Sequence, residues 1–170
     1  MDVKRRMVLK FMFGSLAGML SLKPFPSEAS IFMNDESQFV NLCNLAISHE
    51  YGAIVQYINH SGLISDKSIW SVLLENMNDE VVHARELTRI LVKEGANPTL
   101  AVWPPQTGKK KIELLKEDIA GENAAIELYQ KILDLPESKK YRDLIYSFLK
   151  REKVHRERLQ RLLDALLLKG

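Results

Sequence analysis

The sequence predicts an all-α protein, an antiparallel four-helix bundle made of two helical hairpins that a long crossover joins. Three observations predict it. Four segments, each ~25–30 residues long, carry apolar residues at the three- and four-residue steps of a helix. Gly and Pro are sparse and gather between these segments. The first and third connections are short, which indicates antiparallel neighbours, whereas the second is long.

The helices can be placed in order from their start and stop residues. They are expected over residues 35–61, 66–94, 110–133 and 137–168. Ser65 or Asp66 caps the second helix and Gly95 stops it, and Pro136 suits the first turn of the fourth. The crossover, residues 95–108, contains three prolines and two glycines, so no continuous helix runs through it.

Residues 1–29 are predicted to be a signal peptide, which leaves residues 30–170 as the folded domain. Arg5 and Arg6 precede a mostly apolar run that is shorter than the ~20 apolar residues of a membrane-spanning helix. Small residues then flank Glu28, as a signal peptidase requires, so cleavage is expected after Ala29.

The order Arg5-Arg6-x-x-Leu9-Lys10 resembles a twin-arginine signal, although Lys4 stands where Ser or Thr is usual. The resemblance implies export of the folded protein to a bacterial periplasm. The alternatives are an ordinary secretory signal and an uncleaved N-terminal anchor. The chain is expected to meet a membrane only through this leader, if the leader is not cleaved.

Charge and cysteine content exclude other classes of site. The leader holds five basic and two acidic residues, which leaves 19 basic and 20 acidic residues in the rest of the chain. This balance predicts no nucleic-acid partner. Cys43 is the only cysteine, so neither an intramolecular disulfide nor a cysteine-based metal site is expected. Its apolar neighbours predict a buried thiol.

The two predicted hairpins repeat each other at one constant offset, the separation in sequence between Glu50 and Glu122. The first pair of matching stretches is Glu50-x-x-Ala53-Ile54-x-x-Tyr57 and Glu122-x-x-Ala125-Ile126-x-x-Tyr129. The second pair is Glu80-x-Val82-His83-x-x-x-Leu87 and Glu152-x-Val154-His155-x-x-x-Leu159. We interpret the repeat as an internal duplication related by an approximate two-fold axis.

The spacing of this repeat predicts one polar layer in the bundle core. Residues three apart share a helix face, so each Glu-x-x-His pair directs both side chains to one place. In an antiparallel hairpin, two residues are level when the turn lies midway between them. The lone Glu and the paired Glu of each hairpin have their midpoint at a predicted turn, residue 65 or residue 137. The layer then contains Glu50, Glu80, His83, Glu122, Glu152 and His155.

Four carboxylates and two imidazoles predict a di-metal site. Their formal charge of −4 is costly to bury without cations. Two divalent cations neutralise it, and these ligands suit iron or manganese, with zinc as a substitute. We expect two iron ions. By symmetry each takes one His and one terminal carboxylate, Glu50 or Glu122, while Glu80 and Glu152 bridge.

The stretches around these residues resemble bacterioferritins, which are di-iron proteins of the ferritin-like superfamily. The resemblance covers residues 38–168 and is carried by HEYGAIVQYINHSG, NDEVVHARELTRIL, EDIAGENAAIELY and REKVHRERLQRLL. It implies a ferritin-like bundle in which the six residues match the ferroxidase ligands one for one. It also implies a catalytic role for Tyr57, which matches a tyrosine that supplies an electron.

Three features depart from the bacterioferritin pattern. Val81 stands where a Met ligates haem, so we expect no haem. The stretch from His155 to Gly170 suffices to finish the fourth helix and no more, so we expect no fifth helix. An Asp before the paired Glu orients a ligand His in such sites. Asp79 fits this pattern and Arg151 does not, so the two metal positions are expected to differ in affinity.

The predicted function is a bacterioferritin-like ferroxidase that oxidises Fe(II) with O2 or H2O2, in iron handling or oxidant protection. The alternatives are a di-iron oxidase or peroxidase without iron storage, a ferritin-like oxygenase acting on an organic substrate, and a non-catalytic metal-binding protein. The expected partners are Fe(II), O2 or H2O2, and further copies of the chain in a homo-oligomer, a dimer at least.

Overall fold

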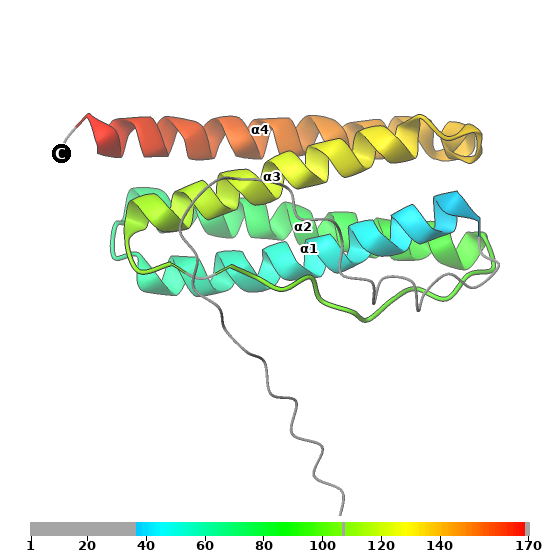
Figure 1. Cartoon of the computed structure of the whole chain (residues 1–170), viewed down its shortest axis with the longest axis horizontal. Coiled ribbons are helices and arrows are strands. Elements are labelled where there is room, and N and C mark those ends of the chain that lie inside the picture. The colour runs from blue at the N-terminus through cyan, green and yellow to red at the C-terminus, as the bar shows by residue number, and fades with distance from the viewer. Residues whose placement is uncertain (1–36, 107, 169–170) are drawn as a thin grey trace, which may run out of the picture. The chain divides into compact units, whose positions relative to one another are not determined.

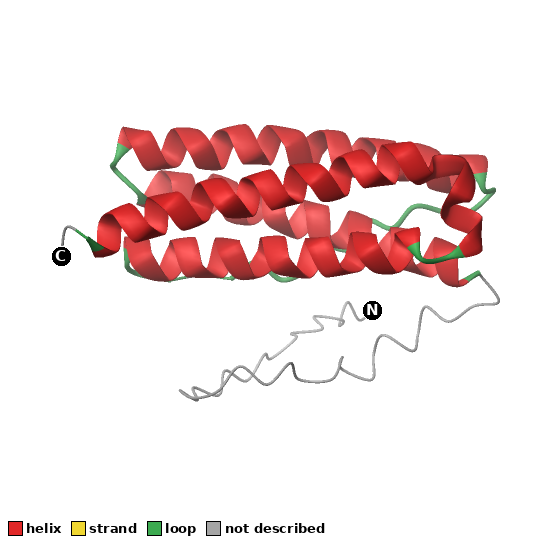
Figure 2. Cartoon of the chain, turned by 90° about the horizontal axis from the view of Figure 1, so that it is seen from above, coloured by secondary structure: helices red, strands yellow, loops and turns green. Residues whose placement is uncertain are grey.

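The computed structural model of this protein describes residues 37–106 and 108–168. It contains the helices α1 (Gln38–Leu63), α2 (Lys67–Lys93), α3 (Lys111–Leu133) and α4 (Arg142–Leu167), and the 3-10 helix η2 (Pro136–Tyr141). The four long helices lie side by side in a bundle (Figures 1 and 2), which confirms the predicted fold class. The predicted signal peptide lies outside the described residues. Within them, no helix has the length and apolar character that crossing a bilayer demands.

Local signals set the ends of α2 as the sequence predicts. The Asp66 carboxylate accepts a hydrogen bond from the Ser68 backbone N–H at 3.0 Å and so caps the start of the helix. The helix ends just before Gly95, whose φ of 74° lies in the left-handed region that favours glycine. The end at Gly95 fixes where the crossover leaves the first hairpin.

The fourth helix begins later than the sequence predicts. Its expected first turn, after Pro136, is the 3-10 helix η2, and α4 itself starts only at Arg142. Tyr141 separates the two, because its φ of −119° and ψ of 8° lie outside the helical region. Its side chain is anchored: the hydroxyl donates to Glu94 at 2.6 Å, and the ring stacks on Phe39 with centroids 6.0 Å apart. This tertiary contact, which the sequence does not reveal, accompanies the break.

The crossover lies along α1 and is hydrogen-bonded to it (Figure 1). The Thr99 backbone N–H donates to the Asn44 side chain at 2.8 Å. The Trp103 backbone N–H donates to the Ser48 carbonyl at 2.9 Å. These bonds satisfy backbone groups of a segment that has no secondary structure of its own, and they hold it against the first hairpin.

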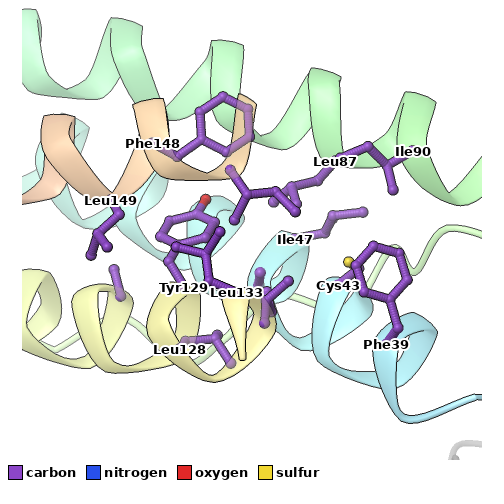
Figure 3. Packing of buried hydrophobic residues seen from close by; sticks show 14 of the residues in the cluster. Phe39, Cys43, Ile47, Leu87, Ile90, Leu128, Tyr129, Leu133, Phe148 and Leu149 are labelled. Atoms are coloured by element: carbon purple, nitrogen blue, oxygen red, sulfur yellow. The ribbon is translucent and has the colours of Figure 1, made fainter. Parts of the chain in front are cut away.

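Two apolar clusters fill the core. The first, shown in Figure 3, includes Phe39, Cys43, Ile47, Leu87, Ile90, Tyr129, Leu133 and Phe148. The second includes Tyr57, Ile64, Ile69, Leu73, Leu114, Leu115, Leu159 and Leu163. Along every helix, the candidate ligands fall in sequence between the residues of the two clusters. Cys43 is buried as predicted, and burial, followed by the charge of Glu94, raises the pKa of its thiol to about 12.

Candidate metal centre

All four helices contribute side chains to one polar layer in the core. The contributors are Glu50 from α1, Glu80 and His83 from α2, Glu122 from α3, and Glu152 and His155 from α4. None of these residues is more than 4% exposed. The structure therefore brings together, in a buried position, all six residues that the sequence singles out.

The ligand atoms of this layer form two overlapping groups, and within each group they lie within 4.8 Å of one another. The first group consists of Glu50, Glu80, His83 and Glu152, and the second of Glu80, Glu122, Glu152 and His155. Glu80 and Glu152 belong to both groups, whereas Glu50 and Glu122 each belong to one. This is the geometry of two cation positions that share two carboxylates.

The contacts of the two histidines show the same division. His83 Nδ1 lies 2.9 Å from Glu80 Oε2 and 2.7 Å from Glu152 Oε1. His155 Nδ1 lies 3.0 Å from Glu80 Oε1 and 3.4 Å from Glu152 Oε2. Each shared carboxylate thus turns one oxygen toward each histidine, as a bridging ligand would.

The donor set fits two metal ions because five of its atoms are buried without hydrogen bonds. Among the described residues, Nδ1 of both histidines, both Glu80 oxygens and Glu152 Oε1 have no hydrogen-bond partner. Unsatisfied buried polar atoms are costly, so native proteins seldom keep them without a ligand. Oxygen and nitrogen atoms at this density suit a divalent cation of the iron or manganese type.

Crowding also makes most of the carboxyl groups hold protons strongly. Burial, and then the charge of Glu80, raise the pKa of Glu50 and of Glu152 well above the usual range. Burial and the charge of Glu122 raise the pKa of Glu80 to about 7. Burial acts in the same direction on Glu122, but interactions with neighbouring side chains, chiefly with His155, outweigh it and lower the pKa of that residue. Cations that enter the layer must therefore displace protons.

Two buried tyrosines hold the outer carboxylates across the hairpins. The Tyr57 hydroxyl on α1 donates to Glu122 on α3. The Tyr129 hydroxyl on α3 donates to Glu50 on α1 at 2.5 Å. The sequence assigns a role at the site to Tyr57 alone, yet the structure gives Tyr129 the equivalent contact. The internal repeat, which places Tyr129 in the position of Tyr57, is the signal that would have found it.

A second buried polar group adjoins the layer, and the sequence did not predict it. His60 Nδ1 lies 2.8 Å from Asp118 Oδ1, and its Nε2 lies 3.1 Å from the Gln106 carbonyl. Gln56 donates from Nε2 to the same Asp118 oxygen at 2.9 Å. This group links α1, α3 and the crossover. In the sequence, Asp118 stands one helical turn before Glu122. This position on the same helix face is the signal that could have indicated its burial.

The His60–Asp118 pair holds an extra proton. The Gln106 carbonyl only accepts hydrogen bonds, so His60 Nε2 carries a proton, and a second proton must lie between Nδ1 and the carboxylate. Burial acts to lower the pKa of His60, but the hydrogen bond and charge of Asp118 outweigh it and raise that pKa. Burial raises the pKa of Asp118 as well.

Solved structures share this architecture. A crystal structure described as ferritin-like, diiron-carboxylate proteins from Bacillus anthracis str. Ames matches with a TM-score of 0.70 at 21% sequence identity, over 74% of this chain and 95% of that chain. No protein-family model and no curated protein matches the sequence. A likeness at this identity bears on the fold. The chain has the ferritin-like fold, with a buried Glu/His layer suited to two metal ions.

Proposed function

We propose that this chain is a bacterioferritin-like ferroxidase, a di-iron carboxylate protein that oxidises Fe(II) with O2 or H2O2. The observation that carries the proposal is the buried layer in which Glu80 and Glu152 are shared between two groups of ligand atoms. When bound, two Fe(II) ions supply two electrons, enough to reduce one O2 to H2O2 or one H2O2 to water.

The side chains of the layer have distinct parts in this proposal. Glu50 and His83 would hold one Fe(II), Glu122 and His155 would hold the other, and Glu80 and Glu152 belong to both groups of ligand atoms. The apolar clusters that lie before and after the layer along each helix limit the access of water.

Tyr57 is assigned the role of an electron donor. Its ring is buried and its hydroxyl donates to Glu122. Where a single Fe(II) is bound, one electron from that ion and one from Tyr57 reduce one H2O2 to two water molecules. The tyrosine also loses its hydroxyl proton, which the Glu122 carboxylate is placed to accept. The role predicts that Tyr57→Phe changes the time course of Fe(II) oxidation while Fe(II) binding persists.

Anaerobic loading with two Fe(II) per chain, followed by exposure to O2, tests the proposed reaction. We expect rapid appearance of ferric absorbance in the wild-type protein and its loss in Glu122→Gln. Glu127→Gln is the matched control, because Glu127 lies on the same helix but is exposed. Oxidation that persists in Glu122→Gln at the wild-type rate would overturn the proposal.

Comparison of the two oxidants assigns the physiological reaction. Faster oxidation of bound Fe(II) by H2O2 than by O2 would indicate oxidant protection, and the reverse would indicate an O2-using ferroxidase. Sizing the ferric product by light scattering separates storage, which leaves a mineral core in the protein, from release of soluble Fe(III).

We also propose that residues 1–29 direct export to the periplasm by the twin-arginine route. The support is the paired Arg5 and Arg6, the apolar run and the small residues before Ser30. Cell fractionation tests it: the mature chain should begin at Ser30 and be periplasmic. The Arg5→Lys, Arg6→Lys double variant should stay in the cytoplasm. Cleavage and export that survive this change would contradict the route.

The domain is proposed to form a homo-oligomer, a dimer at least. The exposed apolar side chains Val55 and Ile58 on α1, and Val81 on α2, support this. Light scattering at micromolar concentration should give at least twice the mass of one chain, and a monomer would contradict the proposal.

A further inference from the structure

Asp79 and Arg151 occupy equivalent places in the two halves of the repeat but carry opposite charges. Each directly precedes the Glu of a Glu-x-x-His pair, and the offset of the repeat relates one to the other. Every candidate ligand, by contrast, is matched by a residue of the same type in the other half. The immediate surroundings of the two histidines are therefore one place where the two-fold symmetry of the site breaks.

The structure shows what this difference does at His155. Asp79 reaches across from α2, and its Oδ2 lies 3.0 Å from His155 Nε2. A carboxylate on Nε2 holds the proton there, which leaves the Nδ1 lone pair facing the shared carboxylates. His155 is fully buried, so its ring is fixed in the orientation that a metal ligand needs.

His83 has no such partner. Among the described residues, no group makes a hydrogen bond with His83 Nε2, and the ring instead packs against Phe148, with centroids 4.6 Å apart. Arg151, the equivalent of Asp79, has no acceptor atom to offer. It lies beside Asp79 instead, with Nε 3.4 Å from Oδ2. Its side chain is half exposed, so its charge is screened and offsets little of the effect of Asp79.

We propose that the two cation positions are unequal: the position of His155 and Glu122 binds a divalent cation tightly and fills first, and that of His83 and Glu50 binds weakly and exchanges. This inference rests on the proposed di-metal site. A carboxylate on the outer nitrogen of a ligand His is worth about 10–100-fold in metal affinity. The protein would then keep one ion in place while the second enters and leaves.

Sequential binding alone does not prove this inequality. Two cations that share two carboxylates repel each other, so even a symmetric site binds its second ion more weakly. The decisive observation is which of the two positions the first ion occupies. Crystals of the demetallated full chain, soaked with less than one equivalent of Co(II), would show it by anomalous scattering at the cobalt edge.

In the wild-type protein the first Co(II) should lie beside His155, at an occupancy at least about 10-fold above that beside His83. Asp79→Asn should bring the two occupancies within about three-fold. The double variant Asp79→Arg, Arg151→Asp keeps the net charge and exchanges the two environments, so it should move the preferred position to His83. The single variant provides an independent result if the double variant does not fold.

Several outcomes would overturn the inference. Equal occupancies in the wild-type protein would do so, as would a preference for His155 that persists unchanged in Asp79→Asn. Both leave the di-metal site itself intact. Saturation of the wild-type protein with fewer than two Co(II) ions would instead overturn the site on which the inference rests, so the two failures can be told apart.

Discussion

At the scale of single residues, hydrogen bonds from two tyrosine hydroxyls position the outer carboxylates, Glu50 and Glu122. Tyr57 and Tyr129 are both buried, and each donates to a carboxylate of the opposite hairpin. Removing either hydroxyl leaves a buried carboxylate without its donor. We expect Tyr57→Phe and Tyr129→Phe each to lower the free energy of unfolding of the metal-free protein by about 1–3 kcal/mol, measured by urea denaturation.

Because the internal repeat relates the two contacts, the two variants should lose similar amounts of unfolding free energy. A loss in one variant with no change in the other would contradict the equivalence of the two tyrosines. The family resemblance points to Tyr57 alone, whereas the repeat points to both tyrosines. The hydrogen bonds themselves join residues 65 and 79 positions apart and follow only from the packing of the hairpins.

The His60–Asp118 pair predicts a pH dependence of stability. Both residues have raised pKa values, so the folded chain holds a proton that the unfolded chain releases. The stabilisation is present below the ordinary histidine pKa of 6.5 and is lost as pH rises through the folded value. We expect the stability difference between wild type and His60→Gln to shrink as pH rises above neutrality.

Urea denaturation of both metal-free proteins across this pH range measures the difference. Comparison with His60→Gln removes the contribution of the ligand carboxylates, which is common to both chains. The groups that face His60 are Asp118 and Glu117 on α3 and the Gln106 carbonyl of the crossover. A difference that grows with pH would contradict the extra proton.

At the scale of elements, the crossover approaches α1 so closely that a side chain at Gly52 would collide with it. A Cβ added at Gly52 would lie 2.6 Å from the Trp103 carbonyl oxygen and 3.0 Å from its Cβ. Backbone at this distance has to move. We expect Gly52→Ala to lower the free energy of unfolding by about 1–3 kcal/mol, because the clash outweighs the gain in helix propensity.

Gly62 on the same helix provides the matched control. A Cβ there meets nothing within 4 Å, so Gly62→Ala should raise the free energy of unfolding by about 0.5–1 kcal/mol. Thermal unfolding of the two variants measures both values. A stable Gly52→Ala protein, or a destabilised Gly62→Ala protein, would mean that helix propensity and not the crossover contact decides.

The helices that the sequence predicts well are those whose ends depend on local chemistry. Asp66 and Gly95 mark the ends of α2 closely because a cap and a left-handed glycine act on their own neighbours. The start of α4 was predicted too early. It coincides with the contacts of Tyr141 with Glu94 and Phe39, which are far away in sequence.

At the scale of the whole molecule, the metal-free layer lowers the free energy of unfolding, and bound cations should remove this destabilisation. Four carboxyl groups buried together lose hydration and repel one another when ionised, and a ligand that binds only the folded state stabilises it by mass action. Zn(II) at 100 times its dissociation constant should raise the free energy of unfolding by about 2.7 kcal/mol per site. Glu152→Gln should be more stable than wild type without metal, yet gain less from Zn(II).

Glu157→Gln is the control for that comparison, since Glu157 is exposed on the same helix as Glu152. It should respond to Zn(II) like the wild-type chain. Calorimetric unfolding with and without Zn(II) measures all three proteins. If Zn(II) raised the free energy of unfolding of Glu152→Gln and of Glu157→Gln by the same amount, the stabilising ion would not lie in the layer.

The arrangement of the whole molecule could be predicted because the chain repeats. The repeat and the two turns place four glutamates and two histidines at one height, and the structure brings those six residues together. The duplication does not apply to the crossover, whose hydrogen bonds with α1 and with His60 have no counterpart among the described residues of the other half. For that reason the buried group around Asp118 could not be derived.

The central claim is that these six side chains bind two metal ions. Anomalous diffraction at the iron edge, from crystals loaded with excess Fe(II) without oxygen, tests it most directly. The account predicts two iron peaks in the bundle core, one beside His83 and one beside His155, both in contact with Glu80 and Glu152. A single peak, no peak in the core, or iron bound only at the surface would contradict it.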